Sequence, residues 1–206
     1  TTEFMASHID DLGTPAAYNH FAVGWAHAMD TPYQWTKQVA SHWGGTRNGC
    51  IVHWPSGITA KGEVRSQFHH VIDVAPTILE AAGIPEPTFV EGVMQSPIEG
   101  VSMGYSFDDS SAKDRHTVQY FEMFGNRGIY HDGWTAVTRH SIPWELSAAS
   151  TPFNDDVWEL YDTNKDWTQA HDLAAEMPEK LADLQRQWLI EATRYNVLPL
   201  NDNRAS

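Results

Sequence analysis

The spacing of apolar side chains predicts two helices. One begins at Pro178, after which apolar residues recur in steps of three or four and so share one helix face: Leu181, Leu184, Trp188, Ala192 and Tyr195. The other has Asp73 as its cap, Pro76 in its first turn and Gly83 just past its end. A cap, a proline and a glycine in this order are the start and stop signals of a helix.

Two shorter patterns precede these helices. Thr31-Pro32 indicates a cap followed by proline. A helix ending at Gly44 is then predicted, because apolar side chains recur at every fourth position: Trp35, Val39 and Trp43. Residues 50–54 are an apolar run closed by Pro55, which is typical of a strand buried on both faces.

The second half of the chain changes to the alternating pattern of a sheet. Residues 84–112 are rich in Pro, Gly and Ser and predict a long irregular connection. Alternating runs follow, with a turn expected at Gly125–Gly128 and a two-residue hairpin at Asp132-Gly133. They predict an antiparallel meander of about four strands, covered on one face by the last helix. We place a boundary near residue 113, between an α/β part at 1–112 and a small α+β domain at 113–206.

Composition and charge narrow the classes of function. The 206 residues carry 13 Lys and Arg against 27 Asp and Glu, a net charge of −14. This excess opposes binding to nucleic acid or to an anionic membrane surface, and no apolar run approaches the roughly 20 residues of a membrane span. Aromatic residues make up 12% of the chain, too many for a disordered acidic segment. The single cysteine, Cys50, excludes an internal disulfide framework.

Eight short strings in a fixed order carry a resemblance to a known family. They are Ile9-Asp10-Asp11-Leu12-Gly13, Gly24-Trp25-Ala26, Thr31-Pro32 with Lys37, Gly44-Gly45-Thr46-Arg47, Val52-His53-Trp54-Pro55, Asp73 through Gly83, Pro97-Ile98-Glu99-Gly100-Val101-Ser102, and Trp158-Glu159-Leu160-Tyr161-Asp162 with Asp166 and Leu173. Each string alone is a weak signal, and the eight together are specific. The chain resembles the C-terminal portion of a bacterial arylsulfatase, a type I sulfatase of the alkaline-phosphatase-like superfamily.

The resemblance implies a fold, a reaction and two cofactors. The fold would be α/β, the last part of a sulfatase sheet followed by the small antiparallel domain, and the missing N-terminal half of the enzyme would be the protein partner. In this family a formylglycine, made from the Cys or Ser of a C/S-x-P-x-R signature, attacks the sulfur of a sulfate ester. A divalent cation, usually calcium, polarises the sulfate oxygens. Because sulfate is a tetrahedral anion, cationic groups and a metal must offset its charge.

The nucleophile and the metal ligands of the family have no clear counterpart here. Cys50 lacks the Pro and Arg of the signature, and the S-x-P strings at Ser141 and Ser150 lack the Arg. Asp10-Asp11 beside His8 could ligate calcium, but the string that follows matches a later segment of the family, which favours carboxylates that structure a loop. We therefore expect a fragment that holds neither formylglycine nor calcium and has no sulfatase turnover alone.

Lys37 is the one catalytic residue that the resemblance carries over. The family places a Lys ahead of a Gly-Gly-x-Arg segment, here residues 44–47, where it binds a sulfate oxygen as a point charge. His42 and Arg47 flank this segment as further candidates for substrate binding. A structural role is favoured for His42, and Arg47 is expected to pair with a carboxylate of the parent fold. His69-His70 are expected to be structural, because no third metal ligand lies at helical spacing.

Two other functions stay open. A phosphate or phosphonate ester hydrolase of the same superfamily could use Lys37 in the same way, since phosphate and sulfate are both tetrahedral anions. A non-catalytic module could use Lys37 to hold a sulfated ligand. The sequence does not define the alcohol part of the ester, and both the bacterial cytoplasm and the periplasm stay open as compartments.

Overall fold

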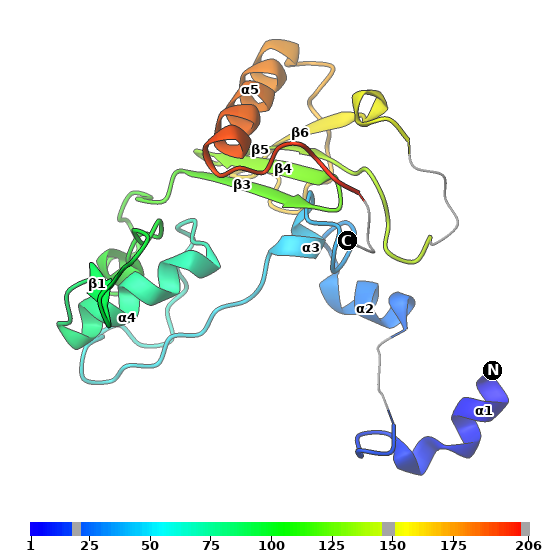
Figure 1. Cartoon of the computed structure of the whole chain (residues 1–206), viewed down its shortest axis with the longest axis horizontal. Coiled ribbons are helices and arrows are strands. Elements are labelled where there is room, and N and C mark those ends of the chain that lie inside the picture. The colour runs from blue at the N-terminus through cyan, green and yellow to red at the C-terminus, as the bar shows by residue number, and fades with distance from the viewer. Residues whose placement is uncertain (18–21, 146–150, 203–206) are drawn as a thin grey trace.

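The computed structural model describes residues 1–17, 22–145 and 151–202, and its largest element is a four-stranded antiparallel sheet (Figure 1). The strands lie in the order β3-β4-β5-β6, so each pairs with the next strand along the chain. Their bounds are Val118–Met123 for β3, Asn126–His131 for β4, Trp134–Thr138 for β5 and Trp158–Asp162 for β6. The predicted meander is confirmed.

Two tight turns connect the first three strands. Asp132 and Gly133 have positive φ values of 47° and 81°, as a type I′ turn requires, so the predicted hairpin is confirmed. The preceding turn uses Phe124 and Gly125, with φ of 53° and 83°. It is tighter than the turn predicted over Gly125–Gly128, because residues 126–128 already pair with β3 as part of β4.

Helix α5, Pro178–Arg194, covers one face of this sheet (Figure 1). Its predicted stripe is confirmed, because three of its side chains are buried against one residue from each of β4, β5 and β6: Leu184, Trp188 and Ala192 pack with Ile129, Ala136 and Leu160. Burial of each large apolar side chain stabilises the fold by about 1.5–3 kcal/mol. Nε1 of Trp188 also donates to the carbonyl of Phe121, at 3.2 Å, which fixes the position of the helix along the sheet.

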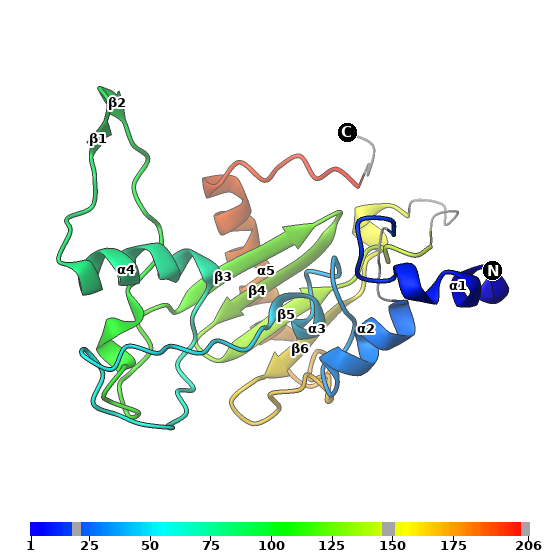
Figure 2. The same ribbon diagram turned by 90° about the horizontal axis from the view of Figure 1, so that it is seen from below.

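The opposite face of the sheet is covered by residues 34–46, which end in the short helix α3, Trp43–Thr46 (Figures 1 and 2). The helix predicted to end at Gly44 is wrong. Trp35 and Gln38 have φ of 65° and 74°, a left-handed conformation that interrupts a right-handed helix. The side chain of Asn126 in β4 donates to the carbonyl of Gln38, at 3.1 Å. Contacts with the sheet therefore override the apolar spacing here.

Helix α4, Val74–Ala82, lies beside the sheet with two short 3-10 turns packed against it (Figure 2). These turns are Val71–Asp73 and Met103–Ser106. Gly83 follows α4 in the left-handed conformation, with φ of 66°, so the predicted end of this helix is confirmed.

The sequence predicts Asp73 as the cap of α4. Asp73 occupies the N-cap position, but its side chain makes no capping hydrogen bond to this helix. Its buried carboxylate accepts from the backbone N–H of Val101, at 2.8 Å, and lies 2.8 Å from Nδ1 of His116. The rings of Phe68 and Tyr130 stack nearby, with their centroids 3.7 Å apart. These contacts join the α4 region to the sheet. The domain boundary predicted near residue 113 lies between them and stays a prediction.

The strand predicted over residues 50–54 is wrong. These residues have no regular structure, and Ile51 is 96% exposed. An extended segment is stable as a strand only beside a paired neighbour. Within the described ranges, none of the strands pairs with this segment.

The remaining elements are short. The connection predicted over residues 84–112 contains a hairpin that projects from the molecule (Figure 2), formed by β1, Phe89–Val90, and β2, Val93–Met94. The other elements are α1 at Thr2–Ser7, α2 at Val23–Asp30, and 3-10 turns at Ile9–Asp11 and Phe153–Asp155. Among the described residues, no helix combines the length and the apolar character needed to cross a membrane.

Candidate functional site

Lys37 lies in a tight turn with its side chain exposed. The N–H of Val39 donates to the carbonyl of Thr36, at 3.1 Å, and closes this turn. Both Thr36 and Val39 are buried, so the backbone is fixed on either side of Lys37. In the part of the chain that the structure describes, no carboxylate forms an ion pair with the Lys37 ammonium. The charge is therefore open to an anion.

The Gly-Gly pair of the motif lets this loop close directly on α3. A Cβ on Gly44 would lie 2.2 Å from the carbonyl oxygen of Gln34, and one on Gly45 would lie 2.1 Å from that of Val39. Any side chain at either position would collide with backbone, which has little freedom to move. The two glycines that mark the motif in the sequence therefore shape the Lys37 loop.

A buried glutamine fastens the loop to the sheet. Oε1 of Gln169 accepts from the backbone N–H of Trp43, at 2.8 Å, and Nε2 of Gln169 donates to the hydroxyl of Thr135 in β5, at 3.0 Å. Gln34 donates in turn to the carbonyl of Gln169 and to the hydroxyl of Tyr161. Gln169 is fully buried, and a buried amide left without these partners would cost about 1–3 kcal/mol.

His42 lies at the centre of this packing. It is fully buried, with the hydroxyl of Ser41 at 2.9 Å from Nδ1 and the carboxylate of Glu159 at 3.3 Å from Nε2. Tyr161 donates to the same carboxylate. Burial opposes ionisation of Glu159, but the hydrogen bonds from His42 and Tyr161 prevail and lower its pKa. His42 therefore links the Lys37 loop to an ionised carboxylate on β6.

Two arginines near the loop lie on aromatic rings. The guanidinium of Arg47 is 4.4 Å from the ring centroid of Trp43, and that of Arg139 is 4.7 Å from the ring of Trp35. Such cation–π contacts contribute about 0.5–1 kcal/mol at exposed sites. Among the described residues Arg47 has no ion pair with a carboxylate, and its pairing with a carboxylate of the parent fold stays a prediction. Arg139 is a cation that no motif in the sequence marks.

The groups considered for a nucleophile or a metal lie apart. Cys50 is exposed, and the hydroxyl of Ser141 donates to the carbonyl of Phe124; Ser150 lies outside the described residues. Asp10 and Asp11 belong to a short 3-10 turn. Within residues 1–17, 22–145 and 151–202, no group of three or more His, Cys, Asp or Glu side chains could hold a metal ion. The donors described here do not fit a calcium site.

His69 and His70 both lie around Asp73. Nδ1 of His69 is 3.6 Å from Oδ2 of Asp73, and the backbone N–H of His70 donates to the same oxygen, at 2.8 Å. The structural interpretation made from the sequence agrees with this arrangement.

Comparison with known proteins gives the family. Residues 34–193 match the family model described as N-sulphoglucosamine sulphohydrolase, C-terminal. The chain belongs to this sulfatase family. The matched part of the sulfatase domain contains the Lys37 loop, the four-stranded sheet and nearly all of α5. The resemblance noted in the sequence to the C-terminal portion of a sulfatase is thereby confirmed.

Two curated relatives of this sulfatase domain are themselves named sulfatases. It is 26% identical over 206 residues to an uncharacterized sulfatase of Schizosaccharomyces pombe, covering 98% of this chain and 34% of the relative. It is 30% identical over 94 residues to an arylsulfatase of Klebsiella aerogenes, covering 46% of this chain and 20% of the relative. The chain thus spans about a third or less of these relatives.

Solved structures show the same fold. A Bacteroides thetaiotaomicron protein of glycosaminoglycan metabolism superposes on the sulfatase domain with a TM-score of 0.55 at 17% identity, over 76% of this chain and 31% of that one. A protein solved with its substrate D-glucosamine-2-N,6-O-disulfate superposes with a TM-score of 0.51 at 20% identity, over 75% of this chain and 29% of that one. This likeness concerns the fold alone, and the expected fold class is confirmed.

Proposed function

We propose that this sulfatase domain is the C-terminal part of an arylsulfatase, which hydrolyses a sulfate ester to an alcohol and inorganic sulfate. Lys37 binds a sulfate oxygen in that enzyme. The observation that carries the proposal is the contrast within one loop: the buried residues Thr36 and Val39 fix the backbone, while the ammonium between them is exposed. A cation that projects from a fixed backbone can stabilise the negative charge that develops on the sulfate oxygens.

The rest of the parent enzyme supplies the groups that this chain lacks. Formylglycine would supply the nucleophile there, and calcium or another divalent cation would offset the charge of the sulfate group. No described cluster of side chains fits the metal, and Cys50 lacks the Pro and Arg of the conversion signature. We therefore assign no step of the reaction to the residues of this chain beyond binding by Lys37.

The N-terminal part of the parent enzyme is the partner of this chain. Apolar side chains face solvent on two neighbouring parts of the molecule: Ile51 and Val52 after the Lys37 loop, and Val74 and Ile78 on α4, with exposures from 40% to 96%. Covering them would stabilise the complex, because each Å² of apolar surface removed from water contributes about 25 cal/mol. The chain spans 34% of its Schizosaccharomyces pombe relative, which leaves room for such a part.

A sulfate ester of a small molecule is the ligand that the relatives favour. One structural neighbour was solved with D-glucosamine-2-N,6-O-disulfate as its substrate, and one sequence relative is named an arylsulfatase. A phosphate or phosphonate ester is the competing ligand, because a lysine ammonium meets either tetrahedral anion as a point charge.

Anion binding by Lys37 can be tested on the full chain by NMR. Titration with sodium sulfate should shift the backbone amides of residues 36–39 in a saturable way, and Lys37→Ala should abolish these shifts. Lys61→Ala is the matched control, since Lys61 is also exposed but lies outside the loop. A parallel titration with phosphate compares the affinities of the chain for the two anions. Equal sulfate binding by the wild type and Lys37→Ala would contradict the proposed role.

The predicted inactivity of the isolated chain needs a separate assay. We expect no release of 4-nitrophenol when the purified chain is incubated with 4-nitrophenyl sulfate and calcium. Turnover that persists in Lys37→Ala would indicate a contaminant. Turnover that is lost in Lys37→Ala would show that the chain holds a complete reaction centre, and it would refute the proposed division between this chain and the rest of the parent.

A further inference from the structure

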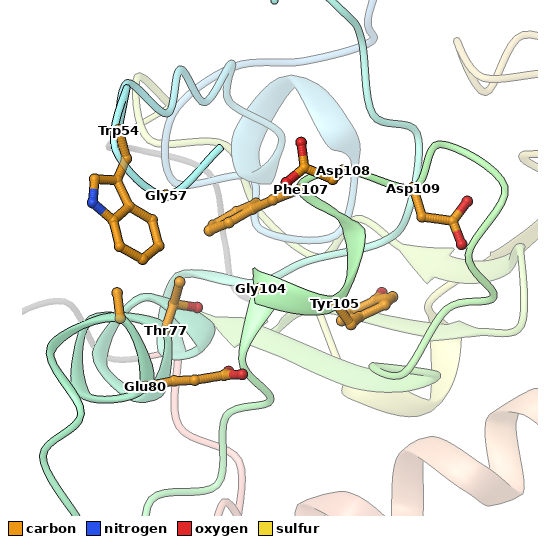
Figure 3. A pocket seen from close by; sticks show the side chains of 10 residues that line it. Trp54, Gly57, Thr77, Glu80, Gly104, Tyr105, Phe107, Asp108 and Asp109 are labelled. Atoms are coloured by element: carbon orange, nitrogen blue, oxygen red, sulfur yellow. The ribbon is translucent and has the colours of Figure 1, made fainter. Parts of the chain in front are cut away.

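A cavity of about 390 Å³ lies away from the Lys37 loop, between α4, residues 104–109 and residues 54–57 (Figure 3). Its walls combine three aromatic rings with three carboxylates: Trp54, Tyr105 and Phe107, and Glu80, Asp108 and Asp109. Among the described residues no Lys, Arg or His side chain lines this cavity.

Two glycines keep the cavity open. A Cβ on Gly57 would lie 2.3 Å from the indole ring of Trp54, so this ring rests directly on the glycine and forms one wall. A Cβ on Gly104 would lie 3.2 Å from the carboxylate oxygen Oε2 of Glu80. In Figure 3 the rings of Trp54 and Phe107 reach into the space from neighbouring segments, and Thr77 and Glu80 lie below them on α4.

Two of the carboxylates have fixed partners. Oδ1 of Asp108 accepts from the backbone N–H of Ala60, at 2.7 Å, and from both donors of Thr59. Oδ1 of Asp109 accepts from the N–H and the hydroxyl of Ser111. Hydrogen bonds of the Ala60 N–H to Asp108, and of the Ser111 hydroxyl to Asp109, lower the pKa of each carboxyl. Both groups thus contribute fixed negative charge.

Glu80 differs from these two aspartates. Within the described ranges its carboxylate accepts no hydrogen bond and forms no ion pair. Two arginines contact residues of the wall. The guanidinium of Arg115 lies 4.5 Å from the ring centroid of Tyr105. The guanidinium of Arg65 donates to the carbonyls of Ser106 and Phe107 and to the carboxylate of Glu63. The charge of Glu80 is therefore available to a ligand.

We propose that this cavity binds a small organic cation, with its ammonium group over the rings of Trp54 and Phe107 and paired with the carboxylate of Glu80. The faces of aromatic rings carry negative charge density and attract ammonium groups. The three carboxylates repel sulfate and other anions, so the ligand is of opposite charge to the one proposed at Lys37. A neutral ligand lacks the net charge that these carboxylates attract.

Choline and its neutral isostere 3,3-dimethyl-1-butanol test the proposal on the full chain. The indole N–H signal of Trp54 is identified in NMR spectra by its loss in Trp54→Phe. We expect choline to shift this signal in a saturable way and the isostere to bind at least threefold more weakly. Glu80→Gln should weaken choline binding by about two- to fivefold, the range of an exposed ion pair. Glu91→Gln, on the exposed β1–β2 hairpin, should not change it.

Three results would overturn the proposal. They are an unmoved Trp54 signal at saturating choline, equal affinity for choline and the isostere, and unchanged choline affinity in Glu80→Gln. Because Glu80 is exposed, Glu80→Gln does not threaten folding. The test is also independent of the sulfate titration, which monitors residues 36–39.

Discussion

Nδ1 of His116 lies 2.8 Å from Oδ1 and 2.9 Å from Oδ2 of Asp73, a residue 43 positions earlier in the chain. The Asp73 carboxylate is fully buried and also accepts from the backbone N–H of His70 and of Val101. One side chain therefore joins α4, the segment at Val101 and the residues that lead into β3.

This pair predicts how stability depends on pH. Burial opposes ionisation of Asp73, but the hydrogen bonds from His116 and its neighbours hold its pKa well below its usual range. Burial likewise opposes protonation of His116, but Asp73 prevails and raises its pKa. The stabilisation from Asp73 is present above its unfolded pKa of about 4 and is lost in acid. That from His116 is present below its unfolded pKa of about 6.5 and is lost as the pH rises through its raised folded value.

Urea unfolding at pH 5.5 and pH 8.5 measures this effect. We expect the free energy of unfolding of the wild type to include a contribution from His116 that decreases from pH 5.5 to pH 8.5. His116→Gln should lack this decrease. His70 contributes in the opposite direction, since burial and the charge of His116 lower its pKa. His53→Gln, at an exposed position, is the control. An unchanged pH dependence in His116→Gln would rule out the proposed linkage.

The carboxylate of Glu159 is expected to hold the Lys37 loop in place. Glu159→Gln removes the charged partner of His42 and Tyr161 and should lower the free energy of unfolding by about 1–3 kcal/mol. Amide hydrogen exchange should become faster in residues 34–46 than in β4. Glu176→Gln, at an exposed site, should change neither quantity. Loss of global stability without faster amide exchange in residues 34–46 would show that Glu159 does not hold the Lys37 loop in place.

Gly45→Ala tests the close approach within the motif. The new Cβ would lie 2.1 Å from the carbonyl oxygen of Val39, and such overpacking costs about 1–3 kcal/mol. Gly24→Ala is the matched control, because it lies within α2 with no atom within 4 Å of the new Cβ. It should stabilise the helix by about 0.5–1 kcal/mol. Thermal unfolding of the two variants distinguishes them, and equal melting temperatures would argue against the contact.

Trp188→Ala tests the core between α5 and the sheet. Trp188 is 4% exposed, and truncation of a buried tryptophan costs about 3–5 kcal/mol. Leu189→Ala changes the next position of the same helix, where the side chain is 51% exposed, and should change stability by less than about 0.5 kcal/mol. The comparison is made by urea unfolding. A small effect of Trp188→Ala would mean that α5 contributes little to the stability of the sheet.

The candidate site could be predicted only in part. Lys37 could be predicted because it stands ahead of Gly44-Gly45, where the family has a Lys. A motif resemblance depends only on positions in the sequence. The partners that fix the loop could not be found in this way. Gln169 meets Trp43 across 126 residues, and Glu159 meets His42 across 117. No motif marks the glutamine or the carboxylate as a partner of the Lys37 loop.

The sequence by itself determined the local elements with strong periodicity: the meander, the Asp132-Gly133 hairpin, α4 and α5. In each of these, side-chain spacing and turn residues favour one conformation without help from distant contacts. Only the tertiary structure decided the Lys37 loop and residues 50–54. The loop takes left-handed turns at Trp35 and Gln38 because sheet residues bind its backbone, and residues 50–54 stay irregular because a strand needs a paired neighbour.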